Sequence, residues 1–143
     1  MPSKLYGNFL LKALNKEVDF DSDTIKVALL TSSYTPDQDA HDYFNDVSTY
    51  EVTGTGYTTG GITLASKTAT YDSGTNVIVL DAADVTWSSS TITARYAVVY
   101  DSTGTSSTSA LIGYVDFGSD QSSTNGNFTI TWDSTGIVRI TVA

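Results

Sequence analysis

The spacing of apolar residues changes along the chain, from a helical period at the start to a period of two beyond Val47. From Ser3 to Glu17 the apolar side chains recur three and four positions apart, as they do on one face of a helix; these are Leu5, Tyr6, Phe9, Leu10, Ala13 and Leu14. This spacing predicts an amphipathic N-terminal helix that accounts for residues 1–17.

A strand and a second, shorter helix are predicted next. The stretch TIKVALLT, residues 24–31, is apolar at both alternating sets of positions, which predicts a strand covered on both faces. The stretch TPDQDAHDYFNDV, residues 35–47, predicts a helical turn or short helix. Pro36 suits a first helical turn, and the nearby acids complement the helix dipole.

Beyond residue 47 the pattern is typical of β-strands separated by turns rich in glycine, serine, threonine and asparagine. Strands are predicted at residues 49–53, 61–71, 76–80, 85–88, 92–100, 110–117, 128–132 and 137–142. Because no helices alternate with them, we expect a mainly β fold, an antiparallel β-sandwich or barrel with the N-terminal helix and one short additional helix. The length favours a single domain, residues 1–143, in which residues 24–143 are mostly β.

Charge and composition disfavour or exclude several classes of binding partner and of reactive site. Sixteen acidic residues against seven basic ones give a net charge of -9, which disfavours nucleic acid and anionic membranes as partners. The chain has no cysteine, so disulfides, thiolate metal sites and a cysteine nucleophile are excluded. Lys12 interrupts the apolar run at the start, so no signal peptide is expected, and no run reaches the ~20 apolar residues of a membrane span.

The glycine-rich stretch GTGYTTGG, residues 54–61, does not fit a nucleotide-binding loop. Thr59 stands where a dinucleotide fingerprint needs glycine, and Ile62 follows Gly61 where a phosphate-binding loop needs lysine. The sequence after it predicts a strand instead of a helix. We therefore interpret the glycines as residues that supply positive φ angles and a close backbone approach in a loop between strands.

Asp19, Asp21 and Asp23 alternate as the first ligands of a calcium-binding EF-hand loop do. Thr24 and Leu30 replace the glycine and the bidentate glutamate of that motif, so we favour a solvated acidic turn and leave open whether it binds an ion. His41 is the only histidine, and it lacks the glycine elbow that accompanies a catalytic triad. An exposed histidine among aspartates is the interpretation we favour.

Most other aspartates are expected to form turns: Asp72, Asp81, Asp84, Asp101, Asp120 and Asp133. Asp116 lies inside a strand and is expected to form a buried ion pair with Arg95 or Arg139. Tyrosines can stack on sugars. Tyr96, Tyr100 and Tyr114, however, alternate in step with apolar residues of their strands, so they are expected on the same strand face as those residues. Core packing or a subunit interface is at least as good an interpretation of these three. We expect no catalytic residues, no cofactor and no metal centre.

Four segments together resemble a family of small virion structural proteins of tailed bacteriophages, whose described members are capsid decoration (cement) or related head proteins. The resemblance extends from about Leu5 to the end of the chain, and it is more specific for the family than for the position in the virion. The family supplies no catalytic residues. The segments are DTIKVALLTSSYTPDQDAHDYFNDV, GTGYTTGGITLASKT, DAADVTWSSSTITARYAVVYD and LIGYVDFGSDQSSTNGNFTITWDSTGIVRI.

The resemblance implies a protein on the outer surface of the phage head that binds the major capsid protein and stabilises the lattice, and it leaves open whether the protein forms a homo-oligomer. The alternatives are a tail or baseplate component and a host-glycan-binding module; an enzyme comes third. The residues we expect at the interface are Lys4, Leu5, Phe9, Lys12, Lys16 and Tyr57. For the N-terminal residues among them, packing against the protein's own sheet is the alternative that we favour.

Overall fold

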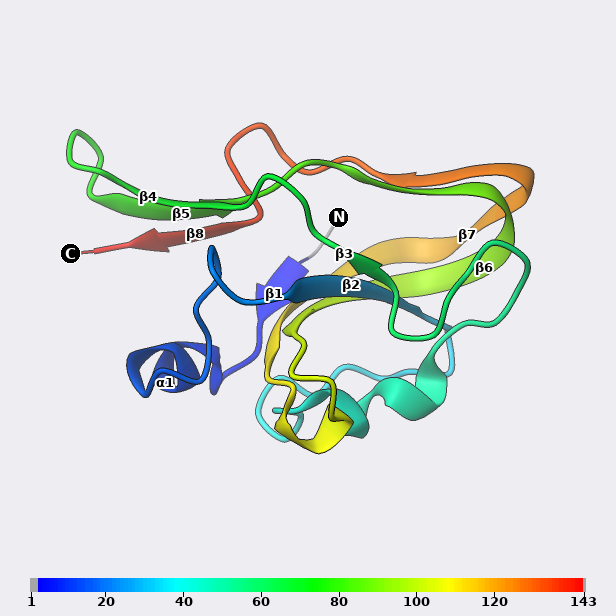
Figure 1. Ribbon diagram of the computed structural model, residues 1–143, viewed down its shortest axis with the longest axis horizontal. Coiled ribbons are helices and arrows are strands. Elements are labelled where there is room, and N and C mark those ends of the chain that lie inside the picture. Colours follow the sequence, from blue (N-terminus) through cyan, green and yellow to red (C-terminus); the bar gives the residue numbers. More distant parts are fainter. Residues whose placement is uncertain (1–2, 143) are drawn as a thin grey trace.

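The computed structural model describes residues 3–142 and shows a mainly β protein with two antiparallel sheets, as predicted (Figure 1). One sheet has the strand order β1-β7-β6-β2-β3 and the other, which we call the outer sheet, has the order β4-β5-β8. The strands are β1 (Ser3–Leu5), β2 (Ile25–Leu30), β3 (Ile62–Thr63), β4 (Thr68–Asp72), β5 (Val77–Asp81), β6 (Val85–Asp101), β7 (Leu111–Ile130) and β8 (Val138–Thr141). The helical elements are α1 (Phe9–Leu14) and three 3-10 turns, η1 (Phe44–Asp46), η2 (Ser48–Tyr50) and η3 (Ser106–Thr108).

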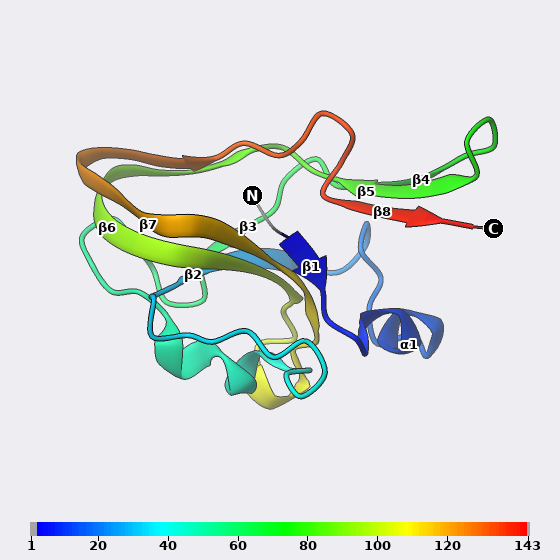
Figure 2. The same cartoon turned by 180° about the vertical axis from the view of Figure 1, so that it is seen from behind.

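The long strands β6 and β7 bend together, so that their two halves contribute to two sandwich-like layers (Figures 1 and 2). The bend contains two register shifts in β6, between Trp87 and Ser90 and between Ser90 and Ile92. Such irregularities bend a strand and increase its twist. The buried Ser90 hydroxyl donates to the Trp87 carbonyl and lies 2.7 Å from the Ser123 hydroxyl of β7, which holds the corner.

Two hydrophobic clusters cover opposite faces of the five-stranded sheet. Along β2, Ile25, Val27 and Leu29 belong to the cluster between the layers, whereas Ala28 and Leu30 belong to the second cluster. The prediction that this strand is covered on both faces is therefore confirmed. The second cluster is rich in tyrosine, and we call it the tyrosine layer; its buried aromatic members are Tyr6, Tyr34, Phe44, Tyr96 and Tyr100.

The N-terminal helix is shorter than predicted. Residues 3–5 form β1, which pairs with β7 through Lys4 opposite Tyr114. The helix begins only at Phe9 and ends at Leu14, and Lys16 adopts a positive φ of 64°. Leu5 and Tyr6 thus fit the helical spacing by coincidence, because they belong to the strand and to the turn after it.

The second predicted helical segment, residues 35–47, contains one 3-10 turn near its end and no α-helix. The Asp37 carboxylate accepts the main-chain N–H groups of Asp39 and Ala40, which stabilises a local turn instead of a helix. Only the 3-10 turns η1 and η2 form, and η2 occupies the first two residues of the strand predicted at 49–53. The strand predicted at 61–71 is divided into β3 and β4.

The polar stretch at residues 118–127, predicted to be a turn, is instead the middle of β7, and β6 runs through the gap predicted at 89–91. Cross-strand hydroxyl pairs accompany this ladder, with Thr93 and Ser122 2.8 Å apart and Thr86 and Thr129 2.9 Å apart. The pairing of polar residues with each other explains why the strands persist here without an apolar pattern.

Candidate protein-binding surface

Helix α1 presents its leucines to solvent. Leu10, Leu11 and Leu14 are 44%, 57% and 83% exposed, whereas Phe9 is buried against the core between the layers. Lys12 is also buried. The helix is therefore apolar on its outer side, which is the reverse of an ordinary surface helix.

Buried Lys12 is compensated by three neighbours. Its ammonium lies 3.5 Å from the Asp42 carboxylate, 3.8 Å from that of Glu17, and 3.6 Å from the centre of the Tyr43 ring. Burial alone would lower the pKa of Lys12, but the Tyr43 contact and the two carboxylates raise it above its ordinary value. Lys12 is thus a charged internal anchor for α1 and leaves the leucines outside.

The outer sheet also carries exposed apolar side chains. Tyr71 of β4 stands opposite Ile78 of β5, which stands opposite Ile140 of β8, so these three side chains share one face of the sheet. Val142 follows two positions later with the same parity. Tyr71 and Val142 are 56% and 47% exposed, so this face extends beyond the part that the core covers.

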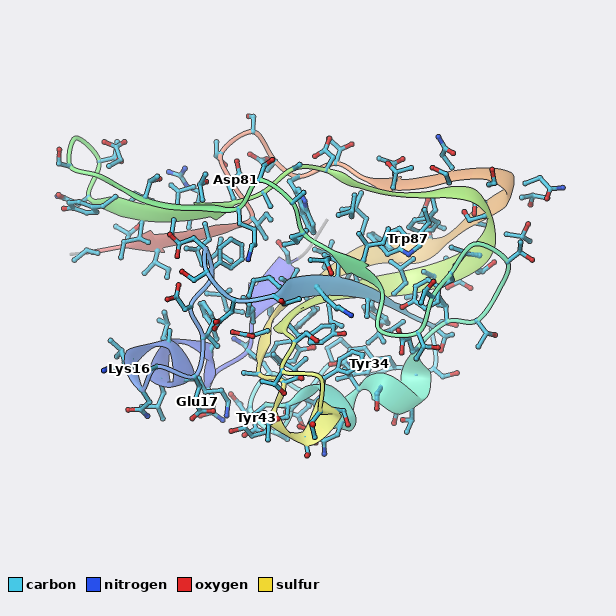
Figure 3. All side chains as sticks on the ribbon, in the orientation of Figure 1. Lys16, Glu17, Tyr34, Tyr43, Asp81 and Trp87 are labelled. Atoms are coloured by element: carbon cyan, nitrogen blue, oxygen red, sulfur yellow. The ribbon has the colours of Figure 1, made fainter. Side chains whose placement is uncertain are left out.

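All five exposed large hydrophobic side chains among residues 3–142 belong to α1 or to the outer sheet and the residue that follows it. Both elements lie at the same end of the molecule in the two opposite views (Figures 1 and 2). We call this region the apolar end; its residues are Leu10, Leu11, Leu14, Tyr71 and Val142. Figure 3 places Lys16 and Glu17 beside α1 at the same end.

The residues predicted from sequence to form an interface occupy different environments. Lys16 is exposed at the apolar end, while Phe9 and Lys12 are buried and cannot contact a partner without rearrangement. Lys4 is exposed on β1, and Leu5 is half-buried beside it. These two line a groove of about 430 Å³ that runs between β1, β7 and the segment before β8.

Tyr57, the remaining predicted interface residue, is directed inward. Its hydroxyl donates to the Glu51 carboxylate at 2.5 Å and accepts the Leu29 N–H at 3.1 Å, and its ring stacks near Trp87. Burial and the neighbouring Glu51 raise the pKa of Tyr57. The same Glu51 oxygen accepts the Gly60 N–H at 2.6 Å. Tyr57 therefore fastens the glycine-rich loop to the sheet.

The glycines of that loop serve the backbone, as predicted. Gly54, Gly56, Gly60 and Gly61 all have positive φ angles. A side chain at Gly61 would collide with the Val27 backbone, and one at Gly54 would collide with the Thr91 carbonyl. The loop thus lies directly against two strands.

The predicted ion pair of Asp116 forms, although at the surface. The Arg95 guanidinium donates to both carboxylate oxygens, from Nε at 2.7 Å and from Nη2 at 3.3 Å, and it lowers the pKa of Asp116. The two side chains are 28% and 23% exposed, so the pair is not buried as expected.

Four tyrosines are buried in the protein interior, and His41 contacts one of them. His41 is half-buried, and its Nδ1 accepts from the Asp37 N–H and lies 3.0 Å from the Tyr34 hydroxyl. The Tyr6 hydroxyl lies 2.8 Å from that of Tyr34. The prediction of an exposed histidine is corrected by this chain of hydrogen bonds. Tyr96 and Tyr100 are buried in the tyrosine layer and Tyr114 packs against it, which confirms core packing.

The predicted turn aspartates divide into two groups. Asp72 and Asp133 do form turns, since each accepts the N–H of a residue two positions later. Asp101 does not, because it is the last residue of β6 and is only 3% exposed. Asp23 accepts the Asp19 N–H at 2.9 Å and so closes a local turn. Within residues 3–142, no three His, Cys, Asp or Glu side chains gather closely enough to hold a metal ion.

Comparisons with family models, with curated proteins and with solved structures found no match to this chain. In the described part of the chain, no helix has the length and apolar character needed to cross a membrane.

Proposed function

We propose that this chain is a structural protein of a tailed-phage virion that decorates the outer surface of the head and binds the major capsid protein through its apolar end. The observation that carries the proposal is the concentration of the exposed large apolar side chains on α1 and the outer sheet. Large exposed apolar side chains gathered at one end of a molecule are typical of a site of protein interaction. The resemblance of the sequence to phage head proteins supplies the identity of the partner.

The charges around the apolar end suit such a contact. The molecule as a whole carries a net charge of -9, which favours solubility and keeps it from packaged DNA. Lys16 is exposed next to α1 and could pair with an acid of the coat protein. The leucines would supply most of the affinity, since complete burial of one such side chain contributes about 1.5–3 kcal/mol before the costs of association.

Decoration would stabilise the head by mass action. A ligand that binds only the assembled lattice shifts the equilibrium toward assembly by an amount that grows with its concentration over its Kd. Contacts that bridge neighbouring capsomers would provide this selectivity, because the complete site exists only after assembly. A small homo-oligomer on the lattice is compatible with the same surface.

A binding titration tests the proposal. Heads that lack this chain are mixed with increasing amounts of the full chain, and bound protein is measured after sedimentation. We expect saturation at a fixed ratio to the coat protein. The double variant Leu11→Ser and Leu14→Ser should bind at least about tenfold more weakly, which corresponds to about 1.4 kcal/mol. The matched control replaces two exposed residues of the bend, Gln121→Ala and Asn127→Ala, and should bind as wild type.

Two outcomes would overturn the proposal. Copurification with tails in place of heads would identify a tail or baseplate component. Binding to host glycans without any particle would identify a glycan-binding module, for which Tyr71 offers the one large exposed ring among the described residues.

A further inference from the structure

Two carboxyl groups from distant parts of the chain are neighbours where β2 begins and β6 ends. Asp101 closes β6 opposite Ile25, and Asp23 precedes Ile25 by two positions, so the two aspartates lie diagonally opposite each other on one face of the paired chains. Asp101 is 3% exposed, and its Oδ2 is buried without a hydrogen-bond donor. Asp23 is half-buried, and one of its oxygens accepts the Asp19 N–H.

Two ionised carboxylates cannot be stable in this arrangement. Both are acceptors only, so a contact between them leaves each without a donor and places two negative charges together in a poorly solvated site. A proton or a metal cation can supply the missing donor, since the nearby Lys67 ammonium donates to the Asp23 main-chain carbonyl and not to a carboxylate. A buried unsatisfied acceptor costs about 1–3 kcal/mol, and more when it is charged.

The surroundings favour a proton over a metal ion. The Lys67 ammonium donates a hydrogen bond to the main-chain carbonyl of Asp23, so a positive charge already stands next to the pair. The pair supplies only two carboxylates where calcium takes six to eight oxygens, so it does not make a complete calcium site. A proton needs no further ligands and gives one carboxyl group the donor that the other requires.

We propose that Asp23 and Asp101 share one proton, and that this proton locks the segment between α1 and β2 onto the end of β6. The segment is tied there by few other bonds, chiefly that from the Ser102 N–H to the Thr24 carbonyl at 2.8 Å. Loss of the proton leaves two facing negative charges, which loosens residues 19–24 and the connection to α1. The lock is independent of what the apolar end binds.

The direction of the pH dependence follows from the raised pKa of Asp101 in the folded protein. Burial, with the Asp23 carboxyl group beside it, raises the pKa of Asp101 from 3.8 to about 7, while the Asp19 N–H and the Lys67 charge act in the opposite direction. In the unfolded chain the group would lose its proton near its ordinary pKa. Between these two values the folded state binds more protons than the unfolded state, so the stability contributed by the pair falls as pH rises from 3.8 to about 7.

Three proteins test the lock: the wild type, Asp101→Asn and the control Asp21→Asn. The asparagine at position 101 can donate permanently to Asp23 and imitates the protonated pair, whereas Asp21 is an exposed neighbour of similar charge. Thermal unfolding is measured at about pH 5 and about pH 9. We expect wild type and Asp21→Asn to lose several degrees more between the two conditions than Asp101→Asn does.

A titration of the wild type tests the same point if Asp101→Asn fails to fold. The side-chain carboxyl carbon of Asp101, followed by NMR, should change with a midpoint near neutrality, and exchange of the Thr24 and Ser102 amides should accelerate beyond its intrinsic pH dependence over the same range. A midpoint near 3.8, the ordinary value, would overturn the proposal. Equal pH dependence in all three proteins would do the same. Stabilisation of the wild type by millimolar calcium that Asp101→Asn lacks would show a metal bridge and also refute the shared proton.

Discussion

The tyrosine layer and the apolar end differ in how far their large side chains are exposed to solvent. In the tyrosine layer, Tyr6 and Tyr34 are 1% exposed although each carries a polar hydroxyl, and these hydroxyls bond each other. At the apolar end, Leu14 has no polar atom in its side chain and is 83% exposed. The chain therefore has the means to cover apolar groups and does so completely in one region.

The contrast teaches that the exposure of the leucines is not explained by a shortage of core. Burying Lys12 under α1 while Leu10, Leu11 and Leu14 face solvent costs stability, because a charged group is desolvated where a leucine could have packed. An arrangement that is poor for folding alone is reasonable if a partner covers the leucines. The following predictions separate the two regions, from the largest expected effect to the smallest.

The same truncation should have very different costs in the two regions. Leu29→Ala removes a side chain that is 0% exposed and should lower the free energy of unfolding by about 2–5 kcal/mol. Leu14→Ala should change it by less than about 0.5 kcal/mol, because the side chain already faces water. Urea unfolding of both variants measures the difference. Similar losses would mean that α1 is packed in solution and that the apolar end is not free.

Removing a single hydroxyl offers a second matched pair. Tyr57→Phe deprives the Leu29 N–H and the Glu51 carboxylate of their partner and should cost about 1–3 kcal/mol. Tyr71→Phe removes an exposed hydroxyl that donates to Asn76, and water can replace that bond. We expect no measurable change for it in the same denaturant titration. If Tyr57→Phe has the same free energy of unfolding as the wild type, other contacts hold the glycine-rich loop against the sheet.

The bend of β6 and β7 should be sensitive to its buried serine. Ser90→Ala leaves the Ser123 hydroxyl without its nearest partner and removes the bond to the Trp87 carbonyl, so we expect a loss of about 1–2 kcal/mol. Ser88→Ala, at an exposed position of the same strand, is the control. If the two variants unfold at the same denaturant concentration, the corner does not depend on the hydroxyl network.

The smallest effect on stability is expected at the apolar end itself. The double variant Leu11→Ser and Leu14→Ser should unfold within about 1 kcal/mol of wild type, since serine is only slightly less favourable than leucine in a short helix. Its self-association at high concentration, measured by light scattering, should decrease. Substantial unfolding of this variant would contradict the view that the leucines serve an external contact.

The sequence pattern predicted the β class, the double-sided burial of β2 and the role of the glycines, because each depends on neighbours close in the chain. It did not predict that β7 continues through residues 118–127, since the hydroxyl partners that accompany it, such as Thr93 for Ser122, lie on another strand. A strand is recognised in a sequence by the alternation of apolar and polar residues. That signal is missing where both faces of the paired strands are polar.

The candidate surface was predicted only in part. The sequence pointed to the N-terminal segment, but the interface residues expected there include Phe9 and Lys12, which are buried, and do not include Leu10 or Leu11. The opposite orientation of Lys12 and Leu14 is set by Asp42, Glu17 and Tyr43, which become neighbours only in the folded chain. Asp101 was likewise expected in a turn, because its contact with Asp23 depends on the pairing of β2 with β6.

A density map of the virion that contains this chain, at a resolution that distinguishes strands, would test the proposed decoration most directly. We predict that the chain lies on the outside of the head, with α1 and the outer sheet against the coat lattice and with the bend of β6 and β7 facing solvent. A chain bound in the tail, or on the head with its leucines facing solvent, would contradict this assignment.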